Sequence, residues 1–227
     1  MSVETGTLTR TQVRSMFDRI APVYDAMNHA MTAGLDRRWR RLTAQAVVTP
    51  RARVLDACCG TGDLALAAHK AGGTVTGLDF SARMLECARR KSAEIEWVEG
   101  DLLELPFEDE SFDAVTVGFG VRNVDDLARA LRELRRVLRP GGRLGILEIV
   151  RPKGPSSLFY SVWFDRLVPL VGKVLPGGAA YRYLPASVKR FPGPTELTEQ
   201  VRAAGFEPVA HRLLGGGIVV LLVGEAA

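Results

Sequence analysis

The sequence predicts an α/β fold: a mostly parallel sheet with helices on both faces and an antiparallel hairpin at the C-terminal end. Two observations lead to this prediction. Short apolar runs alternate with stretches of helical periodicity through the middle of the chain, as expected of parallel strands joined by crossover helices. Near the end, two apolar runs flank Gly215 to Gly217, as expected of a hairpin added to the sheet edge.

Strands are predicted where short apolar runs lie between turn signals. The clearest helix is predicted from Val124 to Leu138, because apolar residues recur along one face, Asp125 and Asp126 fall in its first turn, and Pro140-Gly141-Gly142 follows. Its arginines are expected to form a solvated face. The predicted strands are Arg53 to Ala57, Thr74 to Leu78, Ile95 to Glu99, Phe112 to Val117, Arg143 to Ile149, Phe206 to Leu214 and Ile218 to Gly224.

Composition limits the possible classes of protein. With 227 residues, 47% of them hydrophobic, the chain can bury a sizeable core as one domain with elaborations. A net charge of +4, carried mostly by scattered arginines, does not favour nucleic acid as a partner. Cys58, Cys59 and Cys87 lack a metal-ligand pattern with the histidines, so no metal is expected and a reducing compartment is. Without a signal peptide or an apolar span, we expect a cytoplasmic protein.

The most informative segment is the turn Gly60-Thr61-Gly62, which follows an apolar strand and opens a helix. Glycines there let the backbone approach a ligand, and Asp79, after the next apolar run, can accept hydrogen bonds from a ribose diol. NAD would suit these features too. However, Asp56 and Asp63 bracket the turn with negative charge, which disfavours a pyrophosphate and favours the sulfonium and ammonium of S-adenosylmethionine. Each acid also has a structural explanation, since Asp63 can complement a helix dipole and Asp56 can accept backbone amides.

Two further loops are expected at the same edge of the sheet. Asp101, in Gly100-Asp101-Leu102, is placed either to accept a hydrogen bond from an adenine amino group or to serve as an ordinary turn aspartate. In the loop from Gly118 to Asn123, glycines bring the backbone close to the crevice and Arg122 and Asn123 supply donors. This arginine indicates an anionic or oxygen-bearing substrate.

Three longer motifs make a family resemblance specific. They are Phe-Asp-x-Ile-Ala-x-x-Tyr-Asp at 17–25, Phe-Gly-x-Arg-Asn at 119–123 and Tyr-x-Tyr-Leu-Pro at 181–185. With the glycine turn, they resemble the quinone-biosynthesis C-methyltransferases, class I S-adenosylmethionine enzymes that methylate demethylmenaquinol or the analogous ubiquinone precursor. The resemblance spans almost the whole chain. One departure is Leu222, where many relatives have histidine.

This resemblance implies a class I methyltransferase-like, Rossmann-like fold and a set of site residues. The expected single domain comprises a helical cap (1–50), a donor-binding core (51–150), a helical insertion over the acceptor site (151–193) and a C-terminal helix with the hairpin (194–227). The residues expected to bind the donor are Gly60, Thr61, Asp79, Asp101, Leu102 and Gly118.

Methyl transfer to carbon asks mainly for orientation, which can supply up to roughly 7–11 kcal/mol of the acceleration. A reduced quinone ring becomes a nucleophile as its hydroxyl loses a proton, so a stabilising donor or a base would assist. Arg122 is expected to stabilise the phenolate, and Tyr24 or Asp25 to orient the acceptor or relay a proton. Tyr24 equally suits a packed aromatic that closes the N-terminal helix over the donor.

The segment from Val150 to Phe191 is too long for an ordinary connection. Its apolar stretch from Leu158 to Leu175 is expected to wrap a prenyl tail or rest on a membrane surface, or else to form a helical pair at a homodimer contact. The expected reaction is methylation of demethylmenaquinol, with a benzoquinol precursor of ubiquinone as the alternative acceptor. An NAD-dependent oxidoreductase and a non-catalytic lipid-binding protein remain further alternatives.

Overall fold

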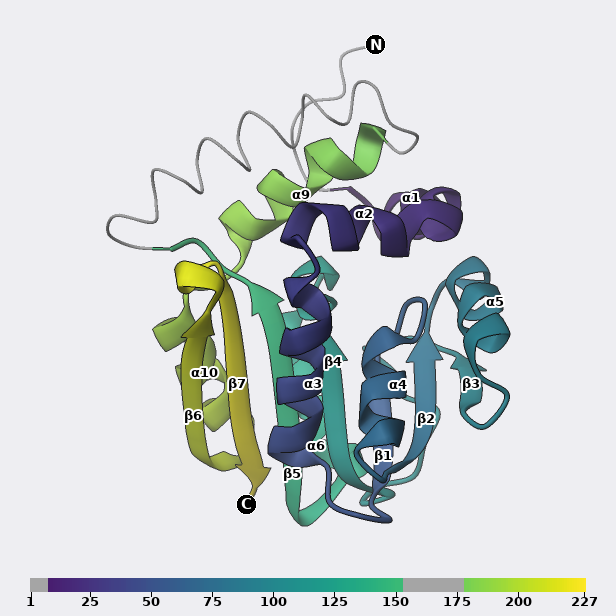
Figure 1. The fold of residues 1–227 in the computed structure, drawn as a ribbon. Helices are drawn as coiled ribbons and strands as arrows, with labels where there is room; N and C mark the ends of the chain where they lie inside the picture. The colour runs from purple at the N-terminus through teal and green to yellow at the C-terminus, as the bar shows by residue number, and fades with distance from the viewer. Residues whose placement is uncertain (1–7, 153–177) are drawn as a thin grey trace.

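The computed structural model describes residues 8–152 and 178–227. Within these residues, seven strands form one sheet in the order β3-β2-β1-β4-β5-β7-β6 (Figure 1). The first five strands are parallel, and β7 runs antiparallel to both β5 and β6, so the predicted fold class is confirmed. The strands are β1 (Arg53–Ala57), β2 (Thr74–Asp79), β3 (Glu96–Glu99), β4 (Phe112–Gly118), β5 (Leu138–Ile149), β6 (Phe206–Leu214) and β7 (Val219–Ala226).

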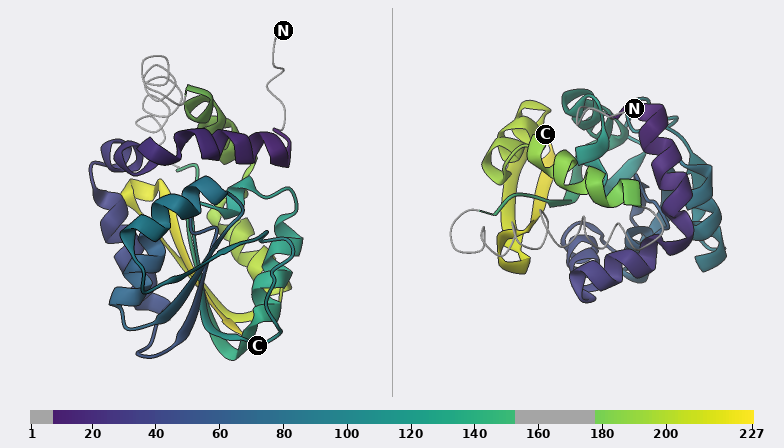
Figure 2. Two further views of the ribbon diagram at one scale, coloured as in Figure 1. Left: turned by 90° about the vertical axis from the view of Figure 1, so that its right-hand side faces the viewer. Right: turned by 90° about the horizontal axis from the view of Figure 1, so that it is seen from above.

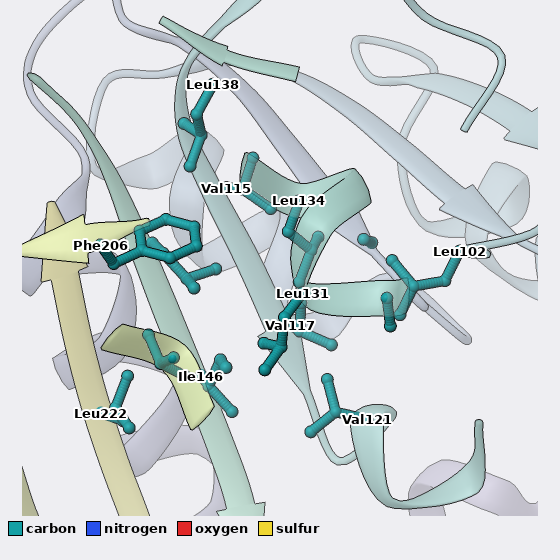
Figure 3. Close-up of a cluster of buried hydrophobic side chains, with 14 of the residues drawn as sticks. Leu102, Val115, Val117, Val121, Leu131, Leu134, Leu138, Ile146, Phe206 and Leu222 are labelled. Carbon is teal, nitrogen blue, oxygen red and sulfur yellow. The ribbon is translucent and has the colours of Figure 1, made fainter. Parts of the chain in front are cut away.

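Helices cover both faces of the sheet. On one face lie α3 (Leu35–Val47) and α4 (Asp63–Lys70), and on the other lie α6 (Leu127–Val137) and α10 (Pro194–Ala203) (Figure 1). The α6 face buries Leu131 and Leu134 in one cluster with Val115 of β4 and Ile146 of β5 (Figure 3). A separate cluster fills the opposite face, beneath α3 and α4. The sheet is therefore buried on both sides, as parallel sheets require.

A helical cap crosses the carboxyl ends of the parallel strands (Figures 1 and 2). It consists of α1 (Arg10–Ile20), the 3₁₀ turn η1 (Ala21–Val23), α2 (Tyr24–Thr32) and α9 (Gly178–Arg190). The helix α5 (Ala82–Lys91) and the 3₁₀ turns η2 (Val121–Asn123) and η4 (Gly215–Gly217) complete the described elements. Ala33 and Gly34, at φ 49° and 78°, turn the chain from the cap into α3. The cap thus lies over the edge of the sheet at which open α/β folds bind their ligands.

The structure corrects the prediction around α6. The helix begins at Leu127, because the Asp126 side chain caps it by accepting from the Arg129 backbone N–H at 2.8 Å. It ends at Val137, where β5 begins at once and includes the Pro140-Gly141-Gly142 segment. The expected solvated arginine face was wrong for Arg136.

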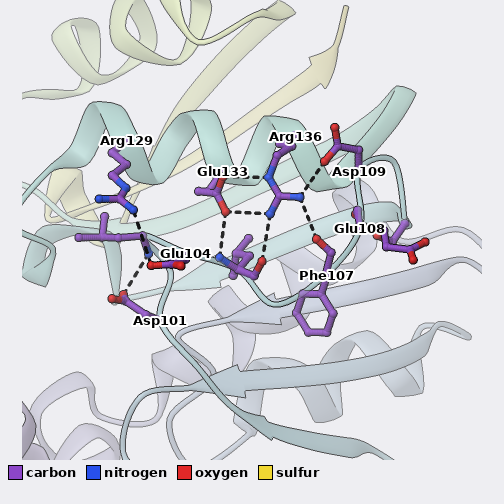
Figure 4. Close-up of polar contacts among 11 residues, drawn as sticks. Asp101, Glu104, Phe107, Glu108, Asp109, Arg129, Glu133 and Arg136 are labelled. Atoms are coloured by element: carbon purple, nitrogen blue, oxygen red, sulfur yellow. Dashed lines mark hydrogen bonds and ion pairs between the residues drawn. The ribbon is translucent and has the colours of Figure 1, made fainter.

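Arg136 instead holds the loop between β3 and β4 in place (Figure 4). Its guanidinium donates to the carbonyls of Leu105 at 3.0 Å and Phe107 at 2.8 Å. It also pairs with Glu133 and Asp109, each at 2.8 Å. A side chain that satisfies two loop carbonyls positions the segment that follows Asp101.

The apolar stretch from Leu158 to Leu175, with the lipid contact expected of it, lies outside the described residues. Among the described helices, none is long and apolar enough to cross a bilayer.

Candidate functional site

A first cavity lies under the cap at the carboxyl ends of β1, β2 and β4. Five of the residues predicted to bind the donor line it together: Gly60, Asp79, Asp101, Leu102 and Gly118. Its other walls include Arg10, Phe17 and Tyr24 of the cap and Phe119, Asn123 and Asp125 of the loop after β4. Thr61 does not line this cavity.

Backbone amides hold Asp79 in the floor of the first cavity. Its Oδ2 accepts from the Gly60 N–H at 2.8 Å and its Oδ1 from the Ser81 N–H at 2.9 Å. Burial raises the pKa of Asp79 to about 6, although these amides favour the charged form. Gly60 has φ +56°, a left-handed conformation that favours glycine. Each carboxylate oxygen keeps acceptor capacity for a ligand hydroxyl.

Asp101 is shared between the cavity and the cap. Its Oδ1 accepts from the Leu103 N–H at 3.0 Å, and its Oδ2 forms an ion pair with Arg10 of α1. Both explanations from the sequence are therefore compatible with its position, because it caps a turn and faces the cavity. Leu102 beside it is 3% exposed and contributes an apolar wall.

The structure changes the charge argument based on Asp56 and Asp63, neither of which lines the first cavity. Asp56 is fully buried, accepts from the Thr116 hydroxyl at 2.8 Å and has a pKa raised to about 7 by desolvation. Asp63 forms an ion pair with Lys91 at 2.6 Å. The acids that face the cavity are instead Asp79, Asp101 and Asp125, and Arg10 is the single cation among its described lining residues.

Asp25 lies at the glycine turn and not in either cavity. Its Oδ1 accepts from the Thr61 hydroxyl at 2.5 Å, and its Oδ2 pairs with Lys91 at 2.6 Å. Two predicted site residues, Asp25 and Thr61, thus meet each other and fasten α2 to the turn. Because Lys91 also pairs with Asp63, one ammonium joins the cap to the first turn of α4.

One row of α1 makes further contacts with the loops around the first cavity. Besides Arg10, Arg14 pairs with Glu99 at 2.5 Å, and the Asp18 carboxylate accepts from the Ser81 hydroxyl at 2.6 Å. These residues are spaced four apart, so they share a helix face. The cap is therefore held over the strand ends by polar side-chain contacts.

A second cavity of about 360 Å³ lies beside the first, beneath α2 and α9. Its walls are mostly apolar and include Met16, Met27, Met31, Trp39, Leu184 and Ile218. Polar groups that reach it include Tyr24, Arg122 and Tyr183. Phe17, Tyr24 and Phe119 line both cavities, so the two spaces share one aromatic wall.

Arg122 lines the second cavity, and its positive charge is balanced by the buried carboxylate of Glu148. Its side chain is 7% exposed, and Nη1 donates to Glu148 Oε1 at 2.6 Å and to the Phe119 carbonyl at 2.5 Å. Its buried Nε has no hydrogen-bond partner. Sequence reasoning missed Glu148, although a lone acid in the apolar run of β5 is a signal that it is buried for a purpose. It also left Tyr183 without a role.

Sequence comparisons match nearly all of this chain. The profile of the ubiE/COQ5 methyltransferase family matches residues 5–225. The demethylmenaquinone methyltransferase of Thermus thermophilus is 46% identical over 219 residues, which cover 92% of this chain and 99% of that protein. The 2-phytyl-1,4-naphtoquinone methyltransferase of Thermosynechococcus vestitus is 39% identical over 223 residues, which cover 95% and 99%.

Solved structures share the fold at much lower identity. The [4+2]-cyclase SpnF superimposes with a TM-score of 0.71 at 20% identity, covering 97% of both chains. A SAM-dependent methyltransferase from Thermotoga maritima, a possible histamine N-methyltransferase, gives a TM-score of 0.65 at 24% identity and covers 94% of this chain and 99% of its own. Because a cyclase stands beside a methyltransferase, these likenesses establish architecture alone.

Proposed function

The chain belongs to the ubiE/COQ5 methyltransferase family, whose members use S-adenosylmethionine in quinone biosynthesis, and on that premise we propose that its acceptor is demethylmenaquinol. The observation that carries the proposal is the aromatic wall of Phe17, Tyr24 and Phe119 between a cavity that three carboxylates face and a larger, more apolar one. Such a division suits a charged donor on one side and a prenylated aromatic ring on the other.

The residues of the first cavity fit the donor. S-adenosylmethionine supplies an electrophilic methyl group on a cationic sulfonium. Asp79 would accept from the ribose hydroxyls and Asp101 from the adenine amino group, while Gly60 and Gly118 would let the backbone lie against the ligand. The carboxylates around the cavity favour a cation over a pyrophosphate, which also disfavours the NAD-dependent alternative. Thr61 would act through Asp25 by holding the glycine turn to α2.

The second cavity would hold the acceptor. Its apolar walls suit a fused ring and the start of a prenyl tail, and Arg122 and the two tyrosines are its candidates for contacting the ring oxygens. Arg122 would donate to the hydroxyl oxygen as the ring becomes a nucleophile. Tyr24 and Tyr183 would orient the ring. A prenylated quinol partitions into lipid, so we also propose that the protein meets its substrate at a membrane surface.

A naphthoquinol is favoured over a benzoquinol because relatives from three bacteria, at 44–46% identity, are demethylmenaquinone methyltransferases. The test supplies purified protein with S-adenosylmethionine and, in separate reactions, reduced demethylmenaquinone, reduced 2-phytyl-1,4-naphthoquinone and the benzoquinol precursor of ubiquinone. Mass spectrometry of the extracted quinones should show a gain of one methyl group, fastest with demethylmenaquinol. A faster reaction with either other acceptor would overturn the assignment.

A further inference from the structure

Glu148 is a fully buried acid that lines neither cavity. Its described hydrogen bonds join it to Arg122 and to the Ile149 backbone. One oxygen, Oε2, accepts from the Arg122 backbone N–H at 3.2 Å. The other, Oε1, accepts from Arg122 Nη1 at 2.6 Å and from the Ile149 N–H at 2.8 Å. The carboxylate therefore fixes both the backbone and the side chain of the arginine.

These contacts decide which part of the guanidinium remains for a ligand. Nη1 has two hydrogens and donates to both Glu148 and the Phe119 carbonyl, so it has no free donor. Nε is buried without a partner, and Nη2 donates in none of the described hydrogen bonds, so these are the donors left in a side chain that lines the second cavity. An unpartnered buried N–H is costly, so the arrangement favours an oxygen acceptor at this place.

Glu148 also determines the net charge of the groups beside the second cavity. An isolated buried guanidinium would be strongly unfavourable, whereas the pair with Glu148 carries no net charge. The acceptor would thus meet an oriented N–H group and not a free cation. Resting on the proposed function, we propose that Glu148 is a positioning residue that fixes the Arg122 guanidinium and limits how strongly it acidifies the acceptor hydroxyl.

Other charged or titratable groups surround this pair. Tyr24 of α2 and Tyr183 of α9 act electrostatically on Arg122, Arg190 and Asp125 act on Tyr183, and Asp36 of α3 lines the second cavity. All of them stay unchanged in the test below, so an altered ionisation can be assigned to position 148.

The test uses the full chain with Glu148→Gln, which removes the charge, and Glu148→Asp, which keeps the charge but shortens the side chain. Glu133→Gln is the matched control, because Glu133 also pairs with an arginine at 2.8 Å, but that arginine, Arg136, lines neither cavity. The probe is 2,4-dimethyl-1-naphthol, in which the ring carbons ortho and para to the hydroxyl already carry methyl groups. Quenching of the intrinsic fluorescence, to which Trp39 of the second cavity contributes, reports binding, and ultraviolet absorbance reports ionisation of the bound hydroxyl.

In Glu148→Gln, the bound naphthol should ionise about one pH unit lower than in wild type, because Arg122 loses its counter-charge. Turnover of demethylmenaquinol should fall about tenfold or more because the arginine is less well oriented, while donor affinity is unchanged. Glu148→Asp should lower turnover without moving the naphthol ionisation, and Glu133→Gln should match wild type in every readout.

Wild-type naphthol ionisation in a folded Glu148→Gln protein would overturn the proposal, as would an equal change in Glu148→Asp. Thermal unfolding shows which variants fold. If Glu148→Gln does not fold, wild-type turnover in Glu148→Asp would overturn the positioning role, and lowered turnover with unmoved naphthol ionisation would support it. A wild-type protein that neither binds the naphthol nor methylates any quinol would instead overturn the proposed function itself.

Discussion

The two cavities are built in different ways. The first cavity takes its floor from the carboxyl ends of consecutive strands and the turns after them, so Gly60, Asp79 and Asp101 lie within a short stretch of sequence. The second cavity draws walls from both ends of the chain, from Met16 of α1 to Val219 of β7. On the proposed assignment of the cavities, donor binding depends on residues close together in the sequence, whereas acceptor binding depends on long-range packing. Substitutions in one cavity should therefore leave binding in the other unchanged.

The largest difference between turnover and donor affinity should come from Arg122→Ala. This change should lower turnover by about 10²-fold or more, because it removes a major electrostatic contact. Donor affinity should stay near wild type. Because this change leaves Glu148 without its partner, the double variant Arg122→Ala with Glu148→Gln serves as the folding control. Single-turnover methylation and a donor titration measure the two effects. A loss of turnover explained by weaker donor binding alone would show that the two cavities are not independent.

Asp79→Ala should produce the opposite pattern. Loss of hydrogen bonds to a charged group should weaken donor binding by ~1–3 kcal/mol. Binding of the naphthol probe in the second cavity should stay the same. Calorimetric titration of the donor measures the first effect and fluorescence quenching the second. Equal losses at both sites would mean that Asp79 supports the whole sheet edge and not the donor alone.

Asp56 should affect stability and its pH dependence more than either ligand. Its pKa is raised to about 7 in the fold, so the protonated form stabilises the folded state and this contribution is lost as pH rises through 7. Between pH 6 and pH 8, Asp56 should lower the free energy of unfolding by about 1 kcal/mol. Asp56→Asn should remove that slope. Urea unfolding at both pH values checks this, and an unchanged slope in the variant would contradict it.

The smallest effect is expected from a substitution in the apolar wall of the second cavity. Met31 lines the second cavity and is only partly buried, so Met31→Ser should disturb the fold little. The Michaelis constant for a long-tailed quinol should rise about threefold, the scale of one lost methylene contact. A short-tailed quinol and the donor should be unaffected. Equal changes for both quinols would place Met31 against the ring and not the tail.

The sequence predicted the site best where a functional residue lies next to a local structural signal. The strand ends, the glycine turn and Asp79 follow from short-range signals, and the structure places five of the six expected donor residues around one cavity. Charge was harder to predict, because the burial of Asp56 and the pairing of Asp63 with Lys91 depend on neighbours distant in sequence.

The contacts that sequence reasoning missed join separate elements. Glu148 meets Arg122 across 26 positions, and Asp25 meets Thr61 across 36. No periodicity reports such pairs, because each residue alone reads as an acid on an apolar strand or in a helix. The second cavity could not be predicted from the sequence either, because it forms only where the cap packs over the sheet.

The two rows of α1 suggest how related enzymes can diversify. Arg10, Arg14 and Asp18 contact residues around the first cavity, whereas Met16 and Ile20 line the second one. A substitution in the second row can reshape the acceptor space without disturbing the first, because the rows occupy different faces of one helix. Evolution can therefore retain a universal methyl donor while it exchanges one lipid-soluble acceptor for another, using changes confined to a few side chains.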